Sequence, residues 1–578
     1  MKKNILFVLR FLASAVFVAL PFVLAGCPGD FTLDNDSAPG SSDVGANVPF
    51  TTYEAEDADF QGELLGRSVT YNEIQSEASG RMAVRLRNHG DFVRFTLTRP
   101  ANAMVLRFSM PDHPSGGGID GSLAVYAGSE RLGEIRLTSR YSWVYNIAGP
   151  GAWPGSKDPA DGPPNRFFND SRLLLGDTWP AGTDITVKKE DSIEWYVIDM
   201  AEFEVAPPPL PRPPNSLCIT EFGAVADGRC SRSALNNAIN AARTQGRRVW
   251  IPQGTFTISG TDNIHVTSAV VSGAGVWHST LSGGAFFFVN GSNNRFHDFA
   301  IFGNVTHRVD SDFHCAFEIL PGGANNIFEN LWIENVKCGF WVRGTRNMVI
   351  RNSRIRNTFA DGINLTAGTH DSIVEHNDMR NHGDDAIAIN SEQNRNSTGN
   401  IVRNNTIRLP YHASGIAVYG GGNNTIENNL IFDAVAFGGG INISSRFNPT
   451  PFSGTTVVRG NKLVRTGSAR SERGRNQGAI WLVAWDSDVS GIRIYGNRLI
   501  DSIVDGITID GSAGRFFRDI EIRNNSVERA GGHGIRIFEG AAGSASFSNV
   551  NVMGAASGGL NNASGDFTVN RLGGNVGW

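Results

Sequence analysis

The chain has 578 residues, of which 40% are hydrophobic and 19% are charged, and its formal net charge is -5 at pH 7. This length exceeds that of one compact domain, so we expect a small domain joined to a longer repetitive unit. The weakly acidic balance offers no concentration of basic charge for binding nucleic acid or another extended anionic partner.

The first 26 residues have the pattern of a secretory signal peptide. Lys2, Lys3 and Arg10 lie in the N-terminal part, an apolar run follows, and small residues precede Cys27. This pattern is typical of a cleaved signal rather than a membrane-spanning helix. Its removal would change the formal charge from -5 to -8, because it carries three positive charges.

The end of this segment, Leu-Ala-Gly-Cys, resembles a bacterial lipobox. The resemblance implies cleavage before Cys27 and attachment of lipid to its sulfur. We therefore expect an exported protein anchored to the bacterial cell envelope, at the outer membrane or cell surface. An ordinary signal peptide with an incidental cysteine is the alternative. Residues 27 to 50 are rich in Gly, Ser, Asp and Pro, which is typical of a flexible tether.

Residues 51 to 206 alternate short strands with glycine-rich turns, which predicts a separate β-sandwich domain of jelly-roll type. The opening YEAEDADF and the closing WYVIDMAEFEV resemble the carbohydrate-binding modules of families 6 and 35, which are β-sandwiches. This resemblance implies a structural calcium ion held by Glu54, Glu56 and Asp199, whose hard oxygen atoms suit that ion. Solvated surface carboxylates are the alternative interpretation.

A proline-rich linker at residues 207 to 216 is expected to stiffen the join to the rest of the chain. The segment after it predicts an amphipathic helix, with Ser231 or Ser233 as N-cap and Gly246 at its end. This helix resembles the N-terminal cap of pectate-lyase-like β-helices, which covers the open end of the solenoid. The residues spaced for its apolar face are Leu235, Ala238, Ile239 and Ala242.

From residue 217 to residue 578 the sequence repeats one unit. An apolar anchor follows an Asn- or Gly-containing turn, as in NNTI, NNLI and NNSV, and a strand of the form G-I-x-I comes after most anchors. Successive anchors lie 22 to 36 residues apart without helical periodicity, which predicts a right-handed parallel β-helix with one coil per repeat. The anchors are Ile333, Ile355, Met379, Ile407, Ile431, Leu463, Leu499 and Val527.

Two acidic sites stand directly before such strands. Asp361 precedes Gly-Ile-Asn-Leu, and the pair Asp384 and Asp385 precedes Ala-Ile-Ala-Ile. Because stacked coils lie roughly 4.8 Å apart, equivalent places in adjacent coils bring the three carboxylates to one patch. Aspartates that only satisfy backbone donors in turns are the alternative. Asp505, which precedes the same DGI pattern several coils away, is expected to be such a turn residue.

The motif DGINL, with the DD pair 23 and 24 residues after its aspartate, resembles the catalytic motif of glycoside hydrolase family 87. The stretches IAVYGGGNNTIENN, SSRF and GAIWL agree with it, and the resemblance runs from about Thr51 to Gly511. Members of this family cleave α-1,3-glucan or the alternating glucan nigeran, as α-1,3-glucanases or mycodextranases. The sequence departs from the family at residues 389 to 391, where an aromatic residue is expected, and this departure bears on substrate preference.

We expect an endo-acting, inverting hydrolase of α-glucan that uses no cofactor. Inversion needs one protonated carboxyl at the leaving oxygen and one ionised carboxylate that holds water, roughly 6.5 to 9.5 Å apart. By analogy with the related polygalacturonase β-helices, Asp384 is assigned as general acid, and Asp361 and Asp385 as the groups that activate water. Crowding three carboxyls raises the pKa of one of them, which keeps an acid protonated near neutral pH.

Two further residues are candidates for binding substrate. His412 lies one coil beyond the DD pair, and Arg446 in the SSRF turn is suited to clamp a sugar hydroxyl or carboxylate. A structural histidine and a solvated arginine are the alternatives.

Two other functions are weighed against the hydrolase. A pectin-type hydrolase or polysaccharide lyase is possible on the same fold, but a lyase would need basic residues to neutralise a sugar carboxylate, whereas this site has three acids and no lysine nearby. A non-catalytic glycan-binding surface lipoprotein would carry the repulsion of three carboxylates without benefit. We expect a monomer.

Four cysteines remain after Cys27, and an exported chain can oxidise them. Proximity in the chain favours a pair between Cys218 and Cys230, with buried free thiols as the alternative. The other two are Cys315 and Cys338.

Overall fold

The computed structural model describes residues 44–145, 155–392, 394–471 and 473–578. The signal segment, Cys27 and the tether up to residue 43 lie outside the described residues. Within the described ranges, no helix is both long enough and apolar enough to cross a membrane.

Two antiparallel sheets form the N-terminal domain, which confirms the predicted β-sandwich. One sheet has the order β3-β4-β11-β6-β9 with β1 paired to β11, and the other has the order β2-β5-β10-β7-β8. The hydrophobic core between them takes Leu106 and Ile198 from the first sheet and Phe95 and Val125 from the second. The strands are β1 (Thr51–Glu54), β2 (Asp59–Gln61), β3 (Glu63–Leu65), β4 (Ala83–Leu86), β5 (Phe92–Thr96), β6 (Ala101–Ser109), β7 (Asp120–Ala127), β8 (Glu130–Thr138), β9 (Asn169–Trp179), β10 (Asp184–Lys188) and β11 (Tyr196–Glu204).

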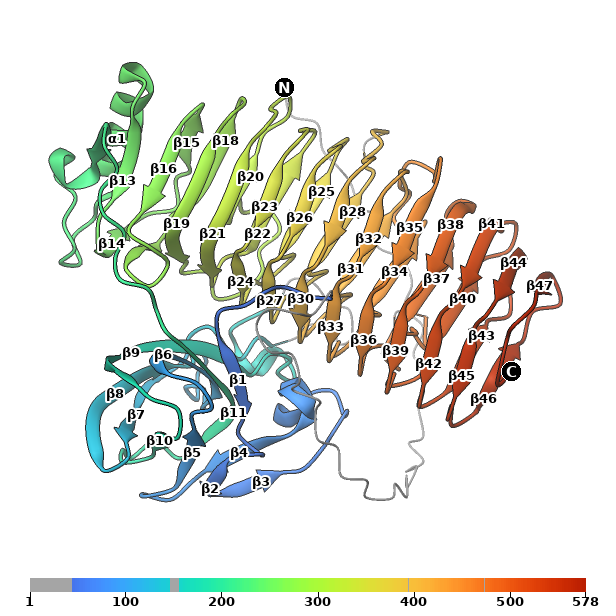
Figure 1. Cartoon of the computed structure of the whole chain (residues 1–578), viewed down its shortest axis with the longest axis horizontal. Coiled ribbons are helices and arrows are strands. Elements are labelled where there is room, and N and C mark those ends of the chain that lie inside the picture. The colour runs from blue at the N-terminus through green and yellow to red at the C-terminus, as the bar shows by residue number, and fades with distance from the viewer. Residues whose placement is uncertain (1–43, 146–154, 393, 472) are drawn as a thin grey trace. The chain divides into compact units, whose positions relative to one another are not determined.

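The predicted cap is the helix α1 (Arg232–Gln245), which lies beside β13 at the N-terminal end of the solenoid (Figure 1). Its apolar face is buried as expected, and Gly246 ends it with a φ of 63°. Ser231 occupies the N-cap position, but its hydroxyl bonds to the backbone of Val225 instead of capping the helix. The short 3-10 helices are η1 (Ile74–Glu77), η2 (Ser79–Arg81), η3 (Pro159–Asp161) and η4 (Ile219–Phe222).

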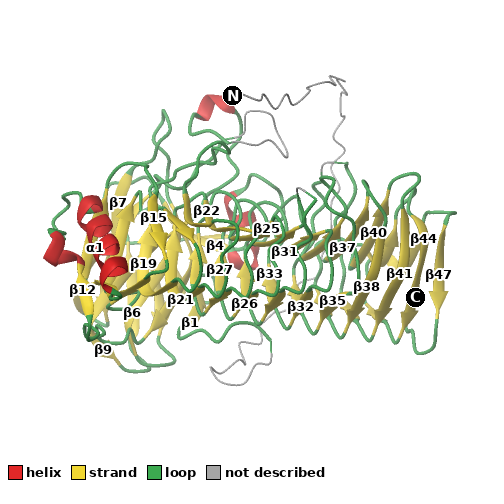
Figure 2. Ribbon diagram, turned by 90° about the horizontal axis from the view of Figure 1, so that it is seen from above, coloured by secondary structure: helices red, strands yellow, loops and turns green. Residues whose placement is uncertain are grey.

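The rest of the chain is a parallel β-helix, as predicted, with strands of neighbouring coils stacked in rows from α1 toward β47 (Figure 2). A 12-stranded sheet receives one strand from each coil. Its strands are β15 (Ile264–Thr267), β18 (Phe287–Asn290), β20 (Cys315–Ile319), β22 (Cys338–Arg343), β25 (Ile363–Thr366), β28 (Ile387–Asn390), β31 (Ile416–Tyr419), β34 (Ile441–Ser444), β37 (Ile480–Ala484), β40 (Ile507–Gly511), β43 (His533–Ile537) and β46 (Gly558–Asn562).

A 24-stranded sheet forms the remaining wall of the β-helix. Its strands are β12 (Ser216–Cys218), β13 (Arg248–Ile251), β14 (Gly254–Ile258), β16 (Val270–Gly273), β17 (Ser279–Gly283), β19 (Arg295–Phe302), β21 (Ile327–Glu334), β23 (Val349–Arg351), β24 (Arg354–Arg356), β26 (Ile373–Glu375), β27 (Asp378–Arg380), β29 (Ile401–Arg403), β30 (Thr406–Arg408), β32 (Thr425–Glu427), β33 (Leu430–Phe432), β35 (Thr456–Arg459), β36 (Lys462–Val464), β38 (Val489–Tyr495), β39 (Arg498–Ile500), β41 (Phe516–Arg523), β42 (Ser526–Glu528), β44 (Ala542–Ser548), β45 (Asn551–Met553) and β47 (Phe567–Arg571).

The predicted anchors are register partners in this sheet. Ile333 pairs with Ile355 and Ile355 with Met379, and every anchor is fully buried. The unequal intervals in the sequence are therefore insertions between strands, because the strands themselves stay in register. The row continues through Ile407, Ile431, Leu463, Leu499 and Val527.

The Asn-Asn pairs before the anchors have two structural tasks. The first asparagine adopts the left-handed conformation that turns the chain, with φ of 53° at Asn404 and 54° at Asn428. The second lies inside the coil, where the Asn405 amide donates to Asn429 at 3.0 Å and the Asn429 amide donates to Asn461 at 3.0 Å. This ladder satisfies polar groups in a buried turn and repeats from coil to coil.

The sandwich packs on the β-helix through buried ion pairs. Glu202 of β11 accepts hydrogen bonds from Arg356 at 2.8 Å and from Arg380 at 2.6 Å. Glu204 pairs with Arg354 at 2.7 Å. A buried charge that loses its partner costs several kcal/mol, so these contacts hold the sandwich against the β-helix. The arginines belong to strands β24 and β27, which precede the acidic residues in the chain.

The cysteines differ from the expected pairing. Cys218 Sγ lies 3.0 Å from the Thr220 hydroxyl, and Cys230 Sγ accepts a hydrogen bond from the backbone of Ser259. Cys315 and Cys338 are instead register partners in adjacent strands. All four thiols are free in the structure, and three of them are buried, as the alternative interpretation has it, whereas Cys230 is exposed.

Candidate active site

The structure brings Asp361, Asp384 and Asp385 together. Ile363 of β25 pairs in register with Ile387 of β28, so Asp361 and Asp385 hold equivalent places two residues before them. One carboxylate oxygen from each of the three aspartates lies within 4.8 Å of the others. These are the facing oxygens, and the distances between them are shorter than the roughly 6.5 to 9.5 Å that separate the two carboxyl groups of most inverting enzymes.

Two glycines beside the acidic residues allow neighbouring coils to approach closely. A Cβ atom at Gly362 would lie 2.5 Å from the carbonyl oxygen of Ala386, and one at Gly383 would lie 2.6 Å from the carbonyl oxygen of Phe359. The backbone of a neighbouring coil, the next one for Gly362 and the preceding one for Gly383, therefore lies too close for any side chain at these positions. This explains the glycine after Asp361 and the one before Asp384.

Burial and mutual repulsion keep two of the carboxyls from ionising easily. Burial raises the pKa of Asp361 well above its ordinary value, and the charges of Asp384 and Asp385 add to this. Burial and Asp384 raise the pKa of Asp385 to about 7. The site therefore retains at least one proton near neutral pH, as the crowding of acids predicts.

Asp384 is the accessible member of the group. Its side chain is 25% exposed, whereas Asp361 and Asp385 are 5% and 3% exposed. One of its oxygens accepts a hydrogen bond from the guanidinium of Arg308 at 2.6 Å, and the other accepts one from the backbone N–H of Asp385 at 2.9 Å. Burial opposes the charge of Arg308, but Asp384 and Asp310 raise its pKa above the ordinary value. Arg308 is therefore a permanent cation at the site.

Asp385 is held by two donors. The backbone N–H of Ser414 donates to Oδ1 and the phenol of Tyr419 donates to Oδ2, both at 2.8 Å. Both hydrogen bonds favour the ionised carboxylate and lower its pKa against the effect of burial. Tyr419 is the register partner of Asn390, so it supplies an aromatic ring one coil from the place where the family resemblance led us to expect one.

His412 and Arg446 both lie near the acidic group. Burial lowers the pKa of His412 to about 4, so its imidazole is neutral at physiological pH, and its ring centroid lies 4.6 Å from that of Phe437. Arg446 is buried rather than solvated, and its charge lowers the pKa of Asp385. Its guanidinium lies over the rings of Trp481 and Trp485, at 5.2 Å and 5.1 Å from their centroids.

Two family models cover almost all of the described chain. The model described as alpha-1,3-glucanase catalytic domain D1 matches residues 47–206, and the one described as alpha-1,3-glucanase catalytic domain D2 matches residues 224–578. The chain belongs to glycoside hydrolase family 87.

Solved structures agree with the family 87 assignment. The chain is similar to the catalytic unit of a thermostable family 87 α-1,3-glucanase from Streptomyces thermodiastaticus strain HF3-3, with 34% identity, a TM-score of 0.83, and coverage of 92% of this chain and 97% of that one. It is also similar to the Agl-KA catalytic domain, with 29% identity, a TM-score of 0.86, and coverage of 92% and 99%.

A third similar structure contains a ligand. It is the catalytic domain of a family 87 α-1,3-glucanase in complex with nigerose, with 28% identity, a TM-score of 0.84, and coverage of 92% and 99%. Variants of such a domain with single aspartates replaced by alanine are bound to nigerose or tetrasaccharides. A search of the curated proteins finds no match.

The family 87 assignment changes the reading of the sandwich. The family model treats residues 47–206 as part of the catalytic unit, and the carbohydrate-binding role inferred from families 6 and 35 stays a prediction. In the structure, Arg166 of this domain donates to the backbone carbonyls of Asn357 and Thr358, at the approach to Asp361. The sandwich thus supports the segment that leads into the acidic site.

The three predicted calcium ligands do not act as one group. Among the described residues, the acidic cluster tight enough to hold a metal ion is the one formed by Asp361, Asp384 and Asp385. Asp199 is buried in an ion pair with Arg107, whereas Glu54 and Glu56 each bury one oxygen without a hydrogen-bond partner. Asp199 already has an arginine partner, although its charge still raises the pKa values of Glu54 and Glu56, and the calcium site stays a prediction.

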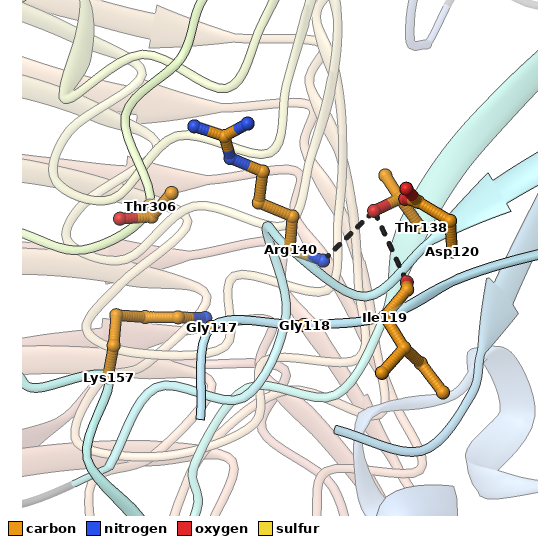
Figure 3. Close-up of a pocket in the computed structure, with 8 residues that line it drawn as sticks. All are labelled: Gly117, Gly118, Ile119, Asp120, Thr138, Arg140, Lys157 and Thr306. Carbon is orange, nitrogen blue, oxygen red and sulfur yellow. Dashed lines mark hydrogen bonds between the residues drawn. The ribbon is translucent and has the colours of Figure 1, made fainter. Parts of the chain in front are cut away.

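Asp505 is the turn residue that the sequence predicts. One of its oxygens accepts from the backbone of His533 at 2.7 Å, and the other accepts from the amide of Asn476 at 3.1 Å. A separate hollow of about 450 Å³ is lined by the sandwich residues Arg140 and Lys157 and by Thr306 of the β-helix (Figure 3). Asp120 is the only carboxylate among the described residues that line it, so it lacks the paired acids of the family 87 site.

Sequence reasoning missed Arg308 and Tyr419. Arg308 lies in an irregular segment between β19 and β20, and no local pattern connects it with an aspartate 76 residues later. Tyr419 could have been predicted, because it ends the strand in the repeat directly after the DD pair. The spacing of the repeats could have placed it beside Asn390.

Proposed function

We propose that this protein hydrolyses α-1,3-glucosidic linkages of α-glucan, with Asp384 as general acid and with Asp361 and Asp385 holding the attacking water. The observation that carries the proposal is a group of three carboxyls within 4.8 Å, of which two are buried and one is accessible. In the relatives with alanine variants, the replaced aspartates lie 23 residues and then one residue apart. Asp361, Asp384 and Asp385 have the same spacing.

Accessibility supports the division of roles. A general acid must touch the glycosidic oxygen, and Asp384 is the carboxyl with an exposed surface. Both oxygens of Asp385 already accept hydrogen bonds, and Asp361 is almost fully buried. Neither is free to attack the anomeric carbon, so they act on the sugar through water. A water-mediated attack opposite the leaving group gives inversion, despite the short distances between the carboxyls.

The proton balance follows from the same geometry. In the free protein Asp384 is paired with Arg308, and the raised pKa of Asp361 keeps a proton within the group. As the glycosidic oxygen takes the place of the guanidinium, the proton passes to Asp384 and from there to the leaving oxygen. Water adds to the anomeric carbon and gives its proton to Asp361 or Asp385, so the group ends with the same number of protons.

Substrate contacts are proposed for His412 and Arg446. The neutral imidazole of His412 is able to donate to or accept from a sugar hydroxyl, and the cation of Arg446 to donate to one. Both side chains lie close to the acids. The charge of Asp384 raises the pKa of His412 against the effect of burial, and the charge of Arg446 lowers the pKa of Asp385. No cofactor enters this scheme.

The remaining expectations complete the proposal. The lipobox-like sequence supports export and a lipid anchor at Cys27, and hence contact with the bacterial envelope. We also propose that the enzyme cleaves the polysaccharide internally and acts as a monomer. A calcium ion is proposed at Glu54 and Glu56. If mass spectrometry of membrane fractions found unmodified Cys27 in the mature protein, the proposed lipid anchor would be wrong.

The function is tested by incubating the chain without its first 27 residues with insoluble α-1,3-glucan, nigeran, polygalacturonate and dextran. Reducing ends and ultraviolet absorbance are followed together. Reducing sugar from α-1,3-linked glucan without new absorbance is expected. Absorbing product from polygalacturonate would identify a lyase, and silence on all four substrates would overturn the proposal. Early release of oligosaccharides of mixed length would separate endo from exo action.

A further inference from the structure

Phe447 combines two unfavourable features in one residue. Its side chain is 64% exposed, and its backbone has a φ of 68°, in the left-handed region that bulky residues avoid. It lies in the SSRF turn directly after β34, and Asn448 continues the turn with a φ of 49°. A single exposed apolar side chain is ordinary, but strain and exposure together are typical of functional sites.

The ring of Phe447 is held from behind by a rigid group of side chains. Its centroid lies 5.5 Å from that of Tyr419 and 4.6 Å from the guanidinium carbon of Arg446. Arg446 is itself fixed between Trp481 and Trp485, whose rings lie 5.8 Å apart in an edge-to-face arrangement. The inner side of the ring is therefore supported, while its outer surface remains open to solvent.

This group is continuous with the acidic site. The phenol of Tyr419, which contacts the Phe447 ring, donates to Asp385 at 2.8 Å. Tyr419 of β31 is the register partner of Asn390 in β28 and of Ser444 in β34, three residues before Phe447. Two strand spacings separate β28 from β34, which corresponds to about 10 Å. An oligosaccharide that reacts at Asp384 and extends along the solenoid reaches Phe447.

We propose that Phe447 is a stacking platform for a glucosyl unit of the bound α-glucan, on the C-terminal side of the acidic group. A pyranose ring has an apolar C–H face and a polar rim, so it pairs well with an open aromatic face beside a cation that can donate to hydroxyls. Arg446 supplies this cation. The inference rests on the proposed function and adds to it a binding site and a direction for the chain.

The test uses variants that separate stacking from simple apolar contact. Phe447→Ala and Phe447→Leu both lack the ring, and Phe447→Tyr keeps it. Phe516→Ala is the matched control, because Phe516 is also exposed and also lies 4.6 Å from a guanidinium, that of Arg518. Phe516 belongs to β41 in the 24-stranded sheet, away from the strands that carry the acids.

Steady-state kinetics on α-1,3-linked gluco-oligosaccharides of increasing length give the readout. For the longer substrates, Phe447→Ala and Phe447→Leu are expected to raise KM about tenfold and to leave kcat within about twofold. For the shortest cleavable substrate the effect is expected to vanish. Phe447→Tyr and Phe516→Ala are expected to stay within about twofold of the wild type at every length.

The outcomes separate this inference from the function on which it rests. If the wild type does not cleave α-1,3-linked substrate, both fail. If the wild type is active and Phe447→Ala has an unchanged KM on long substrates, the platform alone is overturned. An equal loss for Phe447→Tyr, or an equal effect on substrates of every length, would also overturn it.

Discussion

The guanidinium of Arg308 lies 2.6 Å from a carboxylate oxygen of Asp384, although 76 residues separate the two in the chain. This ion pair joins the irregular segment after β19 to the turn before β28. In the free protein it also places a positive charge at the one accessible acid of the site. Its charge also reaches a second member of the group, since it lowers the pKa of Asp361 against the effect of burial.

Replacing Arg308 should change the pH dependence of catalysis. Without its charge, the pKa of the buried Asp361 rises further, so in Arg308→Ala the kcat/KM profile is expected to move toward higher pH by roughly one unit. Arg308→Lys keeps a cation and is expected to restore the wild-type profile, even where kcat is lower. An Arg308→Ala enzyme with the wild-type profile and only a lower rate would show that the residue is merely structural.

Asp384→Asn should remove the proton donor without disturbing the fold. We expect kcat to fall at least about 100-fold, while binding of an α-1,3-linked tetrasaccharide, measured by calorimetry, is retained. Asp505→Asn is the matched control, because Asp505 precedes the same kind of strand but serves a turn. Its kcat should stay within about threefold of the wild type. Near-wild-type turnover by Asp384→Asn would remove the acid assignment.

The repeat pattern allowed most of this fold to be predicted, because each coil must bury the same apolar positions. Ile355, Met379 and Ile407 could be aligned from spacing alone, and the structure pairs them in register. The same alignment brought Asp361 beside Asp385. Periodicity carries this information since equivalent positions in stacked coils are neighbours in space.

What lies outside the repeat could not be predicted in the same way. Arg308 and Phe447 belong to insertions between strands, and their contacts with Asp384 and Tyr419 depend on how those segments fold back. The predicted pairing of the cysteines was wrong for a related reason. Distance along the chain favoured Cys218 with Cys230, whereas stacking makes Cys315 and Cys338 the neighbours.

The hydrogen bond from Tyr419 should set the acidic limb of the pH profile. The pKa of Asp385 is about 7 because burial and Asp384 raise it, while Tyr419 and Ser414 oppose the rise. If ionised Asp385 helps to hold the attacking water, kcat/KM increases with pH through this value. Tyr419→Phe removes one stabilising donor and is expected to shift the limb upward by up to roughly one pH unit.

Tyr495→Phe is the control for this shift. Tyr495 has its hydroxyl near Arg459 on β35, away from the acids, so its removal should leave the profile unchanged. An unshifted limb in Tyr419→Phe would mean that another group titrates there.

Glu202→Gln should destabilise the join between the sandwich and the β-helix. Glu202 neutralises Arg356 and Arg380, and all three side chains are buried. Loss of the negative charge leaves two buried cations undercompensated, which costs about 3 to 5 kcal/mol. We expect a lower melting temperature and earlier proteolysis between the two domains. Glu134→Gln, which breaks the exposed pair with Arg131, should melt like the wild type.

Glu54 and Glu56 should make stability depend on pH and on calcium. Burial raises their pKa values to about 8 and about 9, so between pH 4.5 and about 9 the native state binds protons that the unfolded chain has lost. The free energy of unfolding therefore falls as pH rises through this range. The double variant Glu54→Gln and Glu56→Gln is expected to show a weaker dependence, because Asp361 and Asp385 still contribute to it, and to melt at a higher temperature than the calcium-free wild type at pH 8.5. Calcium bound to the two carboxylates would replace the lost protons, so it should raise the melting temperature of the wild type at pH 8.5, leave it unchanged at pH 5, and have no effect on the double variant. If calcium raised the melting temperature of both proteins equally, the ion would bind elsewhere. If it changed neither melting temperature, the predicted calcium site would be wrong.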